Sequence, residues 1–164
     1  MSGEQLRRAL TGHPSIARVL DATDRRVDVV AAKPLHTLLL DALIHRPHAA
    51  GVTLVVTASS RESDQVRLAL RSLSADMNVW ELPAWETLPH ERMSPHPETV
   101  ARRLSAIRAV STHSPGDIPL VIVASVRALI QPVNPELGEL SCLRLDVGPS
   151  TDLETWGEQL TRMA

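Results

Sequence analysis

The chain has 164 residues, of which 43% are hydrophobic and 22% charged, which is typical of a folded globular domain. Its net charge of −2 and its three Trp, without any Phe or Tyr, argue against a general phosphate-binding surface or a base-stacking platform. A single cysteine, Cys142, excludes an internal disulfide, and we expect it to pack inertly within an apolar strand. The sequence has no signal-peptide core and no run near the ~20 apolar residues of a membrane helix, so we expect a cytoplasmic protein.

The N-terminal third alternates helix signals with one short strand signal. Ser2-x-x-Gln5 has the form of a capping box and predicts a short first helix, and a second is predicted over Pro14–Asp21. The Val-rich segment 26–31 predicts a first strand. Pro34 then suits the first turn of a helix that continues to about His45.

The middle of the chain carries the clearest sheet signals. Residues 51–57 are β-branched and predict a strand buried on both faces of a parallel sheet. Ser59-x-x-Glu62 is a second capping box, and residues 77–82 predict another strand. The helix between them should face the sheet through Val66, Ala69, Leu70 and Leu73.

The second half begins with a proline-rich loop over residues 83–97 and continues with a helix from 98 to about 110. The spacing of that helix predicts that Val100, Leu104 and Ile107 face inward and Arg102 outward. Further elements are predicted as a buried strand at 118–124, a short helix at 125–131, a last strand at 140–147 and a helix capped by Thr151-x-x-Glu154. The alternation predicts an α/β fold, a parallel sheet with helices on both faces.

A nucleotide-binding domain of this order carries its phosphate loop directly after the first strand. The motif G-x-x-x-x-G-K-[ST] needs glycines whose neighbouring N–H groups can surround a phosphate. The corresponding segment 30–37 has no glycine, and Lys33 precedes Pro34, which has no N–H, rather than Ser or Thr. We therefore expect no nucleotide, no other cofactor and no catalytic site in this segment.

Two other patterns suggest binding chemistry. His90, Glu91 and His96 could hold a metal, but the two histidines are six residues apart with Pro95 between them, which does not match the spacing H-E-x-x-H. Arg102, Arg103 and Arg108 could form a modest basic stripe that contacts DNA weakly.

The loop around Trp85 has two interpretations. Trp85 and Leu88 could fold inward and cover the end of the sheet, as large apolar residues usually do. Alternatively, the loop is a contact for another domain or partner, because its prolines hold a mixture of aromatic, apolar and charged residues in an extended form. The candidate contact residues are Trp85, Glu86, Leu88, Pro89 and Arg92.

Several segments, in order along the chain, resemble the N-terminal region of the bacterial transcription-repair coupling factors (Mfd). They are the loop segment W-E-T-L-P at 85–89 with S-P-H at 94–96, R-R-L at 102–104, L-V-V-T-A at 54–58 with E-S-D at 62–64, and I-V-A-S-V at 122–126 with L-I-Q-P at 129–132. The last of these is also similar to a segment of the excision-repair helicase subunit UvrB.

The resemblance implies a helicase-like fold, that of the first subdomain (1a) of a UvrB-homology module, whose nucleotide loop the coupling factors have lost. Residues 1–147 would form this subdomain, and residues 148–164 would begin the next one, which recruits UvrA. In the family, the distant C-terminal part uses ATP and Mg to translocate on duplex DNA and contacts RNA polymerase. UvrB uses an aromatic-rich hairpin near the region of 83–97 on damaged DNA. Here Trp85 is the only aromatic residue in that loop, which argues against damage probing.

Three hypotheses follow for this chain. The first is a scaffold module without catalysis that packs against other domains of a longer protein and holds the UvrA-recruiting subdomain. The second is weak DNA binding through the three arginines. The third is a small metal-dependent enzyme using His90, Glu91 and His96.

Overall fold

The computed structural model describes residues 3–22, 26–46, 51–87, 93–133, 147–148 and 152–163, the last five of them by their backbone alone. In chain order the elements are α1 (Gly3–Thr11), α2 (Pro14–Asp21), α3 (Lys33–Ile44), β1 (Val52–Thr57), α4 (Ser60–Leu73), β2 (Asn78–Leu82), α5 (Pro97–Ser111), β3 (Leu120–Ser125), α6 (Val126–Leu129) and α7 (Leu153–Met163). The prediction of alternating helices and strands is confirmed over most of this range. No helix among the described residues is long and apolar enough to cross a membrane.

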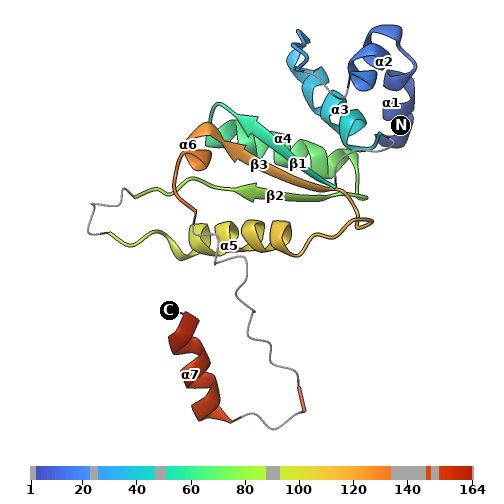
Figure 1. Ribbon diagram of the computed structural model, residues 1–164. Helices are drawn as coiled ribbons and strands as arrows, with labels where there is room; N and C mark the ends of the chain where they lie inside the picture. The colour runs from blue at the N-terminus through green and yellow to red at the C-terminus, as the bar shows by residue number, and fades with distance from the viewer. Residues whose placement is uncertain are drawn as a thin grey trace.

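The three strands form a parallel sheet in the order β1-β3-β2 (Figure 1). In this register Leu54, Ile122 and Trp80 lie side by side across the three strands. The central strand β3 is buried at every position, as its continuous apolar sequence predicts. The parallel sheet is therefore confirmed, and β1 and β2 are its edges.

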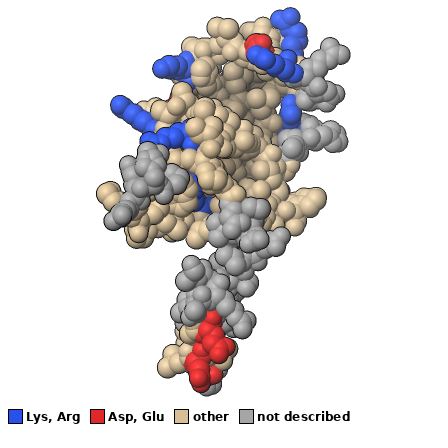
Figure 2. Space-filling model, turned by 60° about the vertical axis from the view of Figure 1, so that its left-hand side comes forward, with Lys and Arg blue, Asp and Glu red and all other residues tan. Residues whose placement is uncertain are grey.

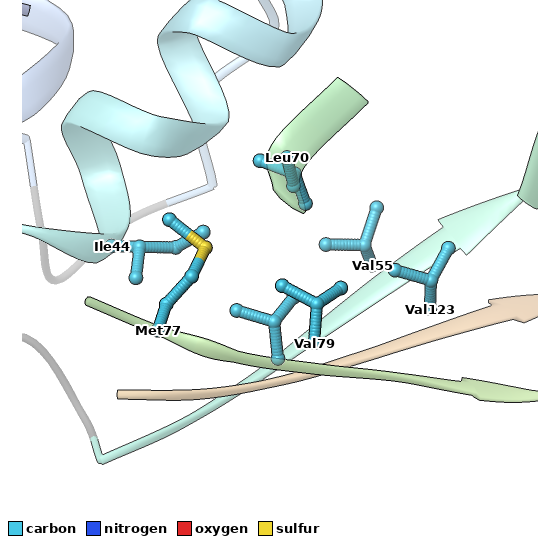
Figure 3. Close-up of a cluster of buried hydrophobic side chains, with 7 residues drawn as sticks. Ile44, Val55, Leu70, Met77, Val79 and Val123 are labelled. Atoms are coloured by element: carbon cyan, nitrogen blue, oxygen red, sulfur yellow. The ribbon is translucent and has the colours of Figure 1, made fainter. Parts of the chain in front are cut away.

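Helices cover both faces of the sheet, as predicted, and each face has its own apolar cluster. On one face α3 and α4 pack over the strands (Figure 3). Its buried members are Ile44, Val55, Leu70, Met77, Val79, Val121 and Val123. On the other face α5 and α6 pack over the strands. The buried members of this cluster are Leu82, Ala106, Leu120, Ile122, Ala124 and Ala128. Each fully buried Val, Leu or Ile contributes roughly 1.5–3 kcal/mol, so these two clusters dominate the stability of the fold.

A buried carboxylate attaches the N-terminal helices to this sheet domain. Asp41 on α3 is 1% exposed and contacts three groups from different segments. The Nε atom of Arg7 on α1 lies 3.2 Å from it, the Ser74 hydroxyl donates to it at 2.6 Å, and Nδ1 of His45 lies 3.3 Å away. Because a buried charge is stable only when it is paired and hydrogen-bonded, this network fixes α1 against α3 and the turn after α4.

The predicted starts of α3 and α4 are confirmed. The Ser59 hydroxyl accepts from the N–H of Glu62 at 3.3 Å, which confirms that capping box. Pro34 lies in the first turn of α3, as predicted. At α7 the cap is Asp152, whose carboxylate accepts from the N–H of Glu154 at 3.1 Å, while Thr151 lies outside the described residues.

Two strand predictions are wrong in part. Residues 26–31 form no strand and do not join the sheet, and Val27, Val29 and Val30 are exposed, because a segment without a hydrogen-bonded neighbour has no sheet surface to bury. The β1 strand forms, but it is not buried on both faces, since it lies at an edge. The predicted strand 140–147, which contains Cys142, lies outside the described residues except for Val147.

Candidate functional site

The segment that would carry a phosphate loop leads directly into α3. Ala32 is extended and precedes the helix, so no loop separates the segment 26–31 from the first turn. Pro34 has no N–H, and the N–H of Leu35 donates to the Ala32 carbonyl at 2.8 Å. Two of the first three helical residues therefore offer no N–H to an anion, whereas a phosphate site depends on such groups.

The Trp85 segment is held tightly at the end of the sheet. The N–H of Trp85 donates to Oε1 of Gln131 at 2.7 Å, and Nε2 of Gln131 donates to the Trp85 carbonyl at 3.3 Å. The Arg103 guanidinium lies 4.4 Å from the centre of the Trp85 ring and donates to the Pro83 carbonyl at 2.6 Å. The residues after β2 are thus tied to α5 and to the chain after α6, with Trp85 half-buried.

Arg103 is the least expected part of this arrangement, because its side chain is only 2% exposed. Burial lowers the pKa of its guanidinium, and the Pro83 carbonyl and the Trp85 ring are its described partners. The predicted inward stripe of α5 is therefore wrong only in part, because Ile107 does pack against the apolar cluster of this face. The buried positions of this helix are Thr99, Arg103 and Ala106, whereas Leu104 is exposed and Val100 and Ile107 are half-buried.

The next residue of the loop is also anchored to α5. The Thr99 hydroxyl donates to the carboxylate of Glu86, and this hydrogen bond lowers the pKa of Glu86. The other candidate contact residues, Leu88, Pro89 and Arg92, lie outside the described residues. Of the two interpretations of this loop, the inward orientation of Trp85 is thus observed, and a partner contact by the rest of the loop stays a prediction.

An ion-pair cluster at the outer edge of β2 was not foreseen from the sequence. Glu81 is buried and pairs with Arg102 from α5 and with Arg67 from α4, whose Nε lies 3.5 Å from its carboxylate. Arg67 also donates to Asp64 at 2.9 Å, which lowers the pKa of Asp64. Burial raises the pKa of Glu81 against the opposing effect of Arg102. The cluster joins helices from both faces around one edge of the sheet.

The same edge has a backbone cap. The Asn78 N–H donates to the Pro119 carbonyl. The backbone N–H and C=O groups of residue 78 therefore face β3, and those of Val79 face away from the sheet. Arg71 on α4 fills that outward position, since its Nη2 and Nε donate to the Val79 carbonyl at 2.7 and 3.2 Å. At the outer edge of β2, one arginine thus hydrogen-bonds a backbone carbonyl, and two others pair with the carboxylate of Glu81.

The three arginines of the DNA hypothesis do not share one face. Arg102 is paired with Glu81, Arg103 is buried, and Arg108 is half-buried beside Trp80 in a hollow of about 730 Å³ between α5 and the start of β2. Figure 2 shows Lys and Arg side chains scattered over the visible face rather than gathered in one patch. Weak DNA contact stays a prediction, and the burial of Arg103 counts against it.

His96 has a structural position. Its Nδ1 accepts from the N–H of Glu98 at 3.3 Å and so caps α5. Among the residues that the structure describes, no group of three or more His, Cys, Asp or Glu side chains is placed to hold a metal ion. His90 and Glu91 lie outside these residues, so the metal hypothesis is untested.

Comparison with known proteins identifies the relatives of this α/β domain. No protein-family model matches the chain. It is 36% identical over 159 residues to the transcription-repair-coupling factors of Mycobacterium bovis and Mycobacterium tuberculosis, which covers 92% of this chain and 12% of those proteins. The transcription-repair-coupling factor of Haemophilus influenzae is 35% identical over 81 residues, or 49% of the chain.

The resemblance found in the sequence is therefore confirmed. The chain is homologous to the N-terminal segment of the transcription-repair-coupling factors, and it spans 12% of the length of the mycobacterial relatives.

Proposed function

We propose that this chain is the N-terminal scaffold module of a transcription-repair-coupling factor, a helicase-like subdomain of the UvrB-homology type with a degenerate phosphate loop. It holds the subdomain that follows it and packs against other domains of the same protein, without binding a nucleotide or catalysing a reaction. The observation that carries the proposal is the homology over 92% of the chain.

The start of α3 supports the absence of nucleotide binding. Its first turn contains Pro34 and follows a segment without glycine, so few N–H groups converge on any one point. The anchored Trp85 segment supports a structural role, since its backbone and ring are committed to Gln131 and Arg103 within the domain.

The remaining activities belong to the longer protein in this proposal. The subdomain that begins near residue 148 recruits UvrA, and the distant C-terminal part translocates on duplex DNA with ATP and Mg and displaces stalled RNA polymerase in the cytoplasm. Residues 1–164 contribute neither step directly.

A nucleotide titration tests the scaffold proposal. Trp85 lies at the end of the sheet, and Trp80 lies on β2, so binding near the strand ends would change Trp fluorescence. With Mg and ATP added to the millimolar range we expect no saturable change. Saturable binding below millimolar ATP would refute the proposal.

A chimera tests the positive side of the proposal. We expect this chain to replace the homologous segment of the M. tuberculosis protein with UvrA capture and DNA-dependent ATP hydrolysis retained. A chimera carrying Arg103→Ala serves as the control, because the loss of the Pro83 and Trp85 contacts should destabilise the module. A well-folded chimera that no longer captures UvrA would contradict the scaffold role.

A further inference from the structure

The helices α1 and α2 form an N-terminal hairpin, residues 3–21, that takes no part in the buried core. They lie against α3, away from the strands of the sheet (Figure 1). No residue of either helix is buried, and none belongs to the buried apolar clusters on the two faces of the sheet. A cavity of about 1100 Å³ lies between the hairpin, the end of α3 and the turn after α4. Because the hairpin is outside the core, its polar contacts have a large influence on how firmly it stays docked.

Two carboxylates at this junction face the same two basic side chains. Arg7 on α1 lies 3.2 Å from Asp41 and 3.9 Å from Asp76. His45, directly after α3, lies 3.3 Å from Asp41 through Nδ1 and 3.2 Å from Asp76 through Nε2. In the described part of the chain, neither Nε of Arg7 nor Oδ2 of Asp41 has a hydrogen-bond partner, so their attraction is electrostatic. Arg7 and a protonated His45 therefore compete for one pair of anions.

The other charged groups that line the cavity leave this competition intact. Glu4 and Arg8 on α1 pair with each other at 2.7 Å. Asp21 on α2 is exposed, and Arg46 donates to a backbone carbonyl of α2 at 3.3 Å. Among the described side chains around the cavity, His45 is the one of a type that changes its charge between about pH 5 and 8.

Protonation of His45 and docking of the hairpin oppose each other. With His45 neutral, Asp41 and Asp76 attract Arg7 without a competing charge. With His45 protonated, one of the two negative charges is already compensated, and the positive charges of Arg7 and His45 repel each other. The docked hairpin therefore opposes proton binding by His45, and by linkage a fall in pH favours release of the hairpin.

Asp76 keeps its charge through this pH range. Burial raises the pKa of Asp76, but its backbone hydrogen bond and the charges of His45 and Arg7 outweigh burial and lower the pKa overall. Both anions are thus present while His45 titrates.

We propose that the N-terminal hairpin is a pH-sensitive element, which is docked while His45 is neutral and is released more often as pH falls and His45 becomes protonated. Release uncovers the end of α3 and the turn after α4, which line the cavity. Asp41 stays paired after release, because the Ser74 hydroxyl and the protonated His45 remain beside it. The inference goes beyond the scaffold function and does not depend on it.

Hydrogen exchange read by mass spectrometry at several pH values measures this release. Peptides from residues 3–21 would be followed in the 164-residue chain, with rates corrected for the intrinsic pH dependence of amide exchange. We expect the protection of 3–21 to fall roughly threefold to tenfold between about pH 8 and about pH 5.5. The amides of β3 are the internal reference for the folded sheet and should keep their protection.

Three substitutions separate the contact of His45 from other effects of pH. His45→Gln is neutral at every pH, so residues 3–21 should stay as protected at low pH as at high pH. Arg7→Met removes the competing cation and should lower their protection at every pH, without a dependence on pH. The matched control is His36→Gln on the same helix, where His36 is exposed, and it should keep the pH dependence of the unaltered chain.

Protection of 3–21 that is unchanged or that rises as pH falls would overturn the proposal. So would a pH dependence that persists in His45→Gln or disappears in His36→Gln. If a substitution at the junction also lowers the protection of β3, the unaltered chain decides. NMR of the His45 ring must then show its protonation over the same pH range as the release of 3–21, and two separate ranges would refute the proposal.

Discussion

The two edges of the sheet use opposite chemistry. At β2, Glu81 and the arginines around it occupy the edge with charged groups from both helical layers. At β1, Val52, Leu54 and Val56 form a half-exposed apolar row, and no hydrogen bond from the described residues reaches their backbone groups. Exposed apolar edges are templates for pairing with another strand, and charged side chains are one of the devices that prevent it. The contrast separates an edge that is lined by charged side chains of the domain itself from an edge that is apolar and half-exposed.

The largest expected loss of stability is at Arg103, which holds the segment after β2 against α5. Arg103→Ala removes the contact with the Trp85 ring and leaves the Pro83 carbonyl without its donor. We expect a loss of about 2–4 kcal/mol in the free energy of unfolding, measured by urea titration, with a change in Trp fluorescence. Arg103→Lys, which keeps the charge but not the planar fork, should recover only part of this loss. An unchanged unfolding midpoint would show that Arg103 does not hold the loop.

A pair of substitutions on β1 compares its two faces. Val55 is buried and Val56 is half-exposed, although they are neighbours in one strand. Val55→Thr places a hydroxyl in the core and should lower the free energy of unfolding by about 1–3 kcal/mol. Val56→Thr should change it by less than about 0.5 kcal/mol in the isolated chain. Equal losses in thermal or urea unfolding would mean that both faces of β1 are covered.

The hydrogen bonds of Arg71 to β2 should contribute less to the free energy of unfolding. Arg71→Met removes the two hydrogen bonds to the Val79 carbonyl while keeping most of the side chain. We expect a loss of about 1 kcal/mol, because water can replace part of the bond at an edge. Arg61→Met on the same helix is the control, since Arg61 is exposed, and it should have no measurable effect. Similar unfolding curves for both variants would show that the hydrogen bonds of Arg71 do not stabilise this edge.

The smallest effect is a pH dependence from Glu81. Burial raises its pKa, so the folded state holds this proton to a higher pH than the unfolded chain does. The stabilising contribution is present below the pKa of the unfolded chain and is lost as pH rises through the higher folded value. We therefore expect wild type to lose stability relative to Glu81→Gln as pH rises above the ordinary range of glutamate. A difference that stays constant or grows in the other direction, measured by urea unfolding from pH 4 to 8, would contradict this assignment.

The sequence predicts the positions of the helices and strands well. It predicts less well which of their residues are buried. The Ser59 capping box, the buried strand β3 and the helix after Pro34 follow from local rules, and the structure confirms them. The spacing of α5 correctly predicts a core contact for Ile107 but wrongly predicts one for Leu104, because periodicity reports apolar residues and not which layer covers them.

The polar anchors were missed for a different reason. Arg103 belongs to a residue type that is normally exposed, and its burial depends on Trp85 and Pro83, which are brought to it only by the fold. The pairing of Glu81 with arginines from two helices likewise depends on strand order, which local patterns do not determine. The lack of glycine at 30–37 is visible in the sequence alone, and the absence of nucleotide binding inferred from it stays a prediction.

The most direct test of the open edge is residue-resolved amide exchange by NMR on the isolated 164-residue chain. The Val55 amide points toward β3, whereas the amides of Leu54 and Val56 point away from the sheet. We expect alternating protection along β1, with Val55 slow and its two neighbours at least tenfold faster. Uniform protection of all three amides in the isolated chain would show that its own residues already close this edge, and would contradict the account.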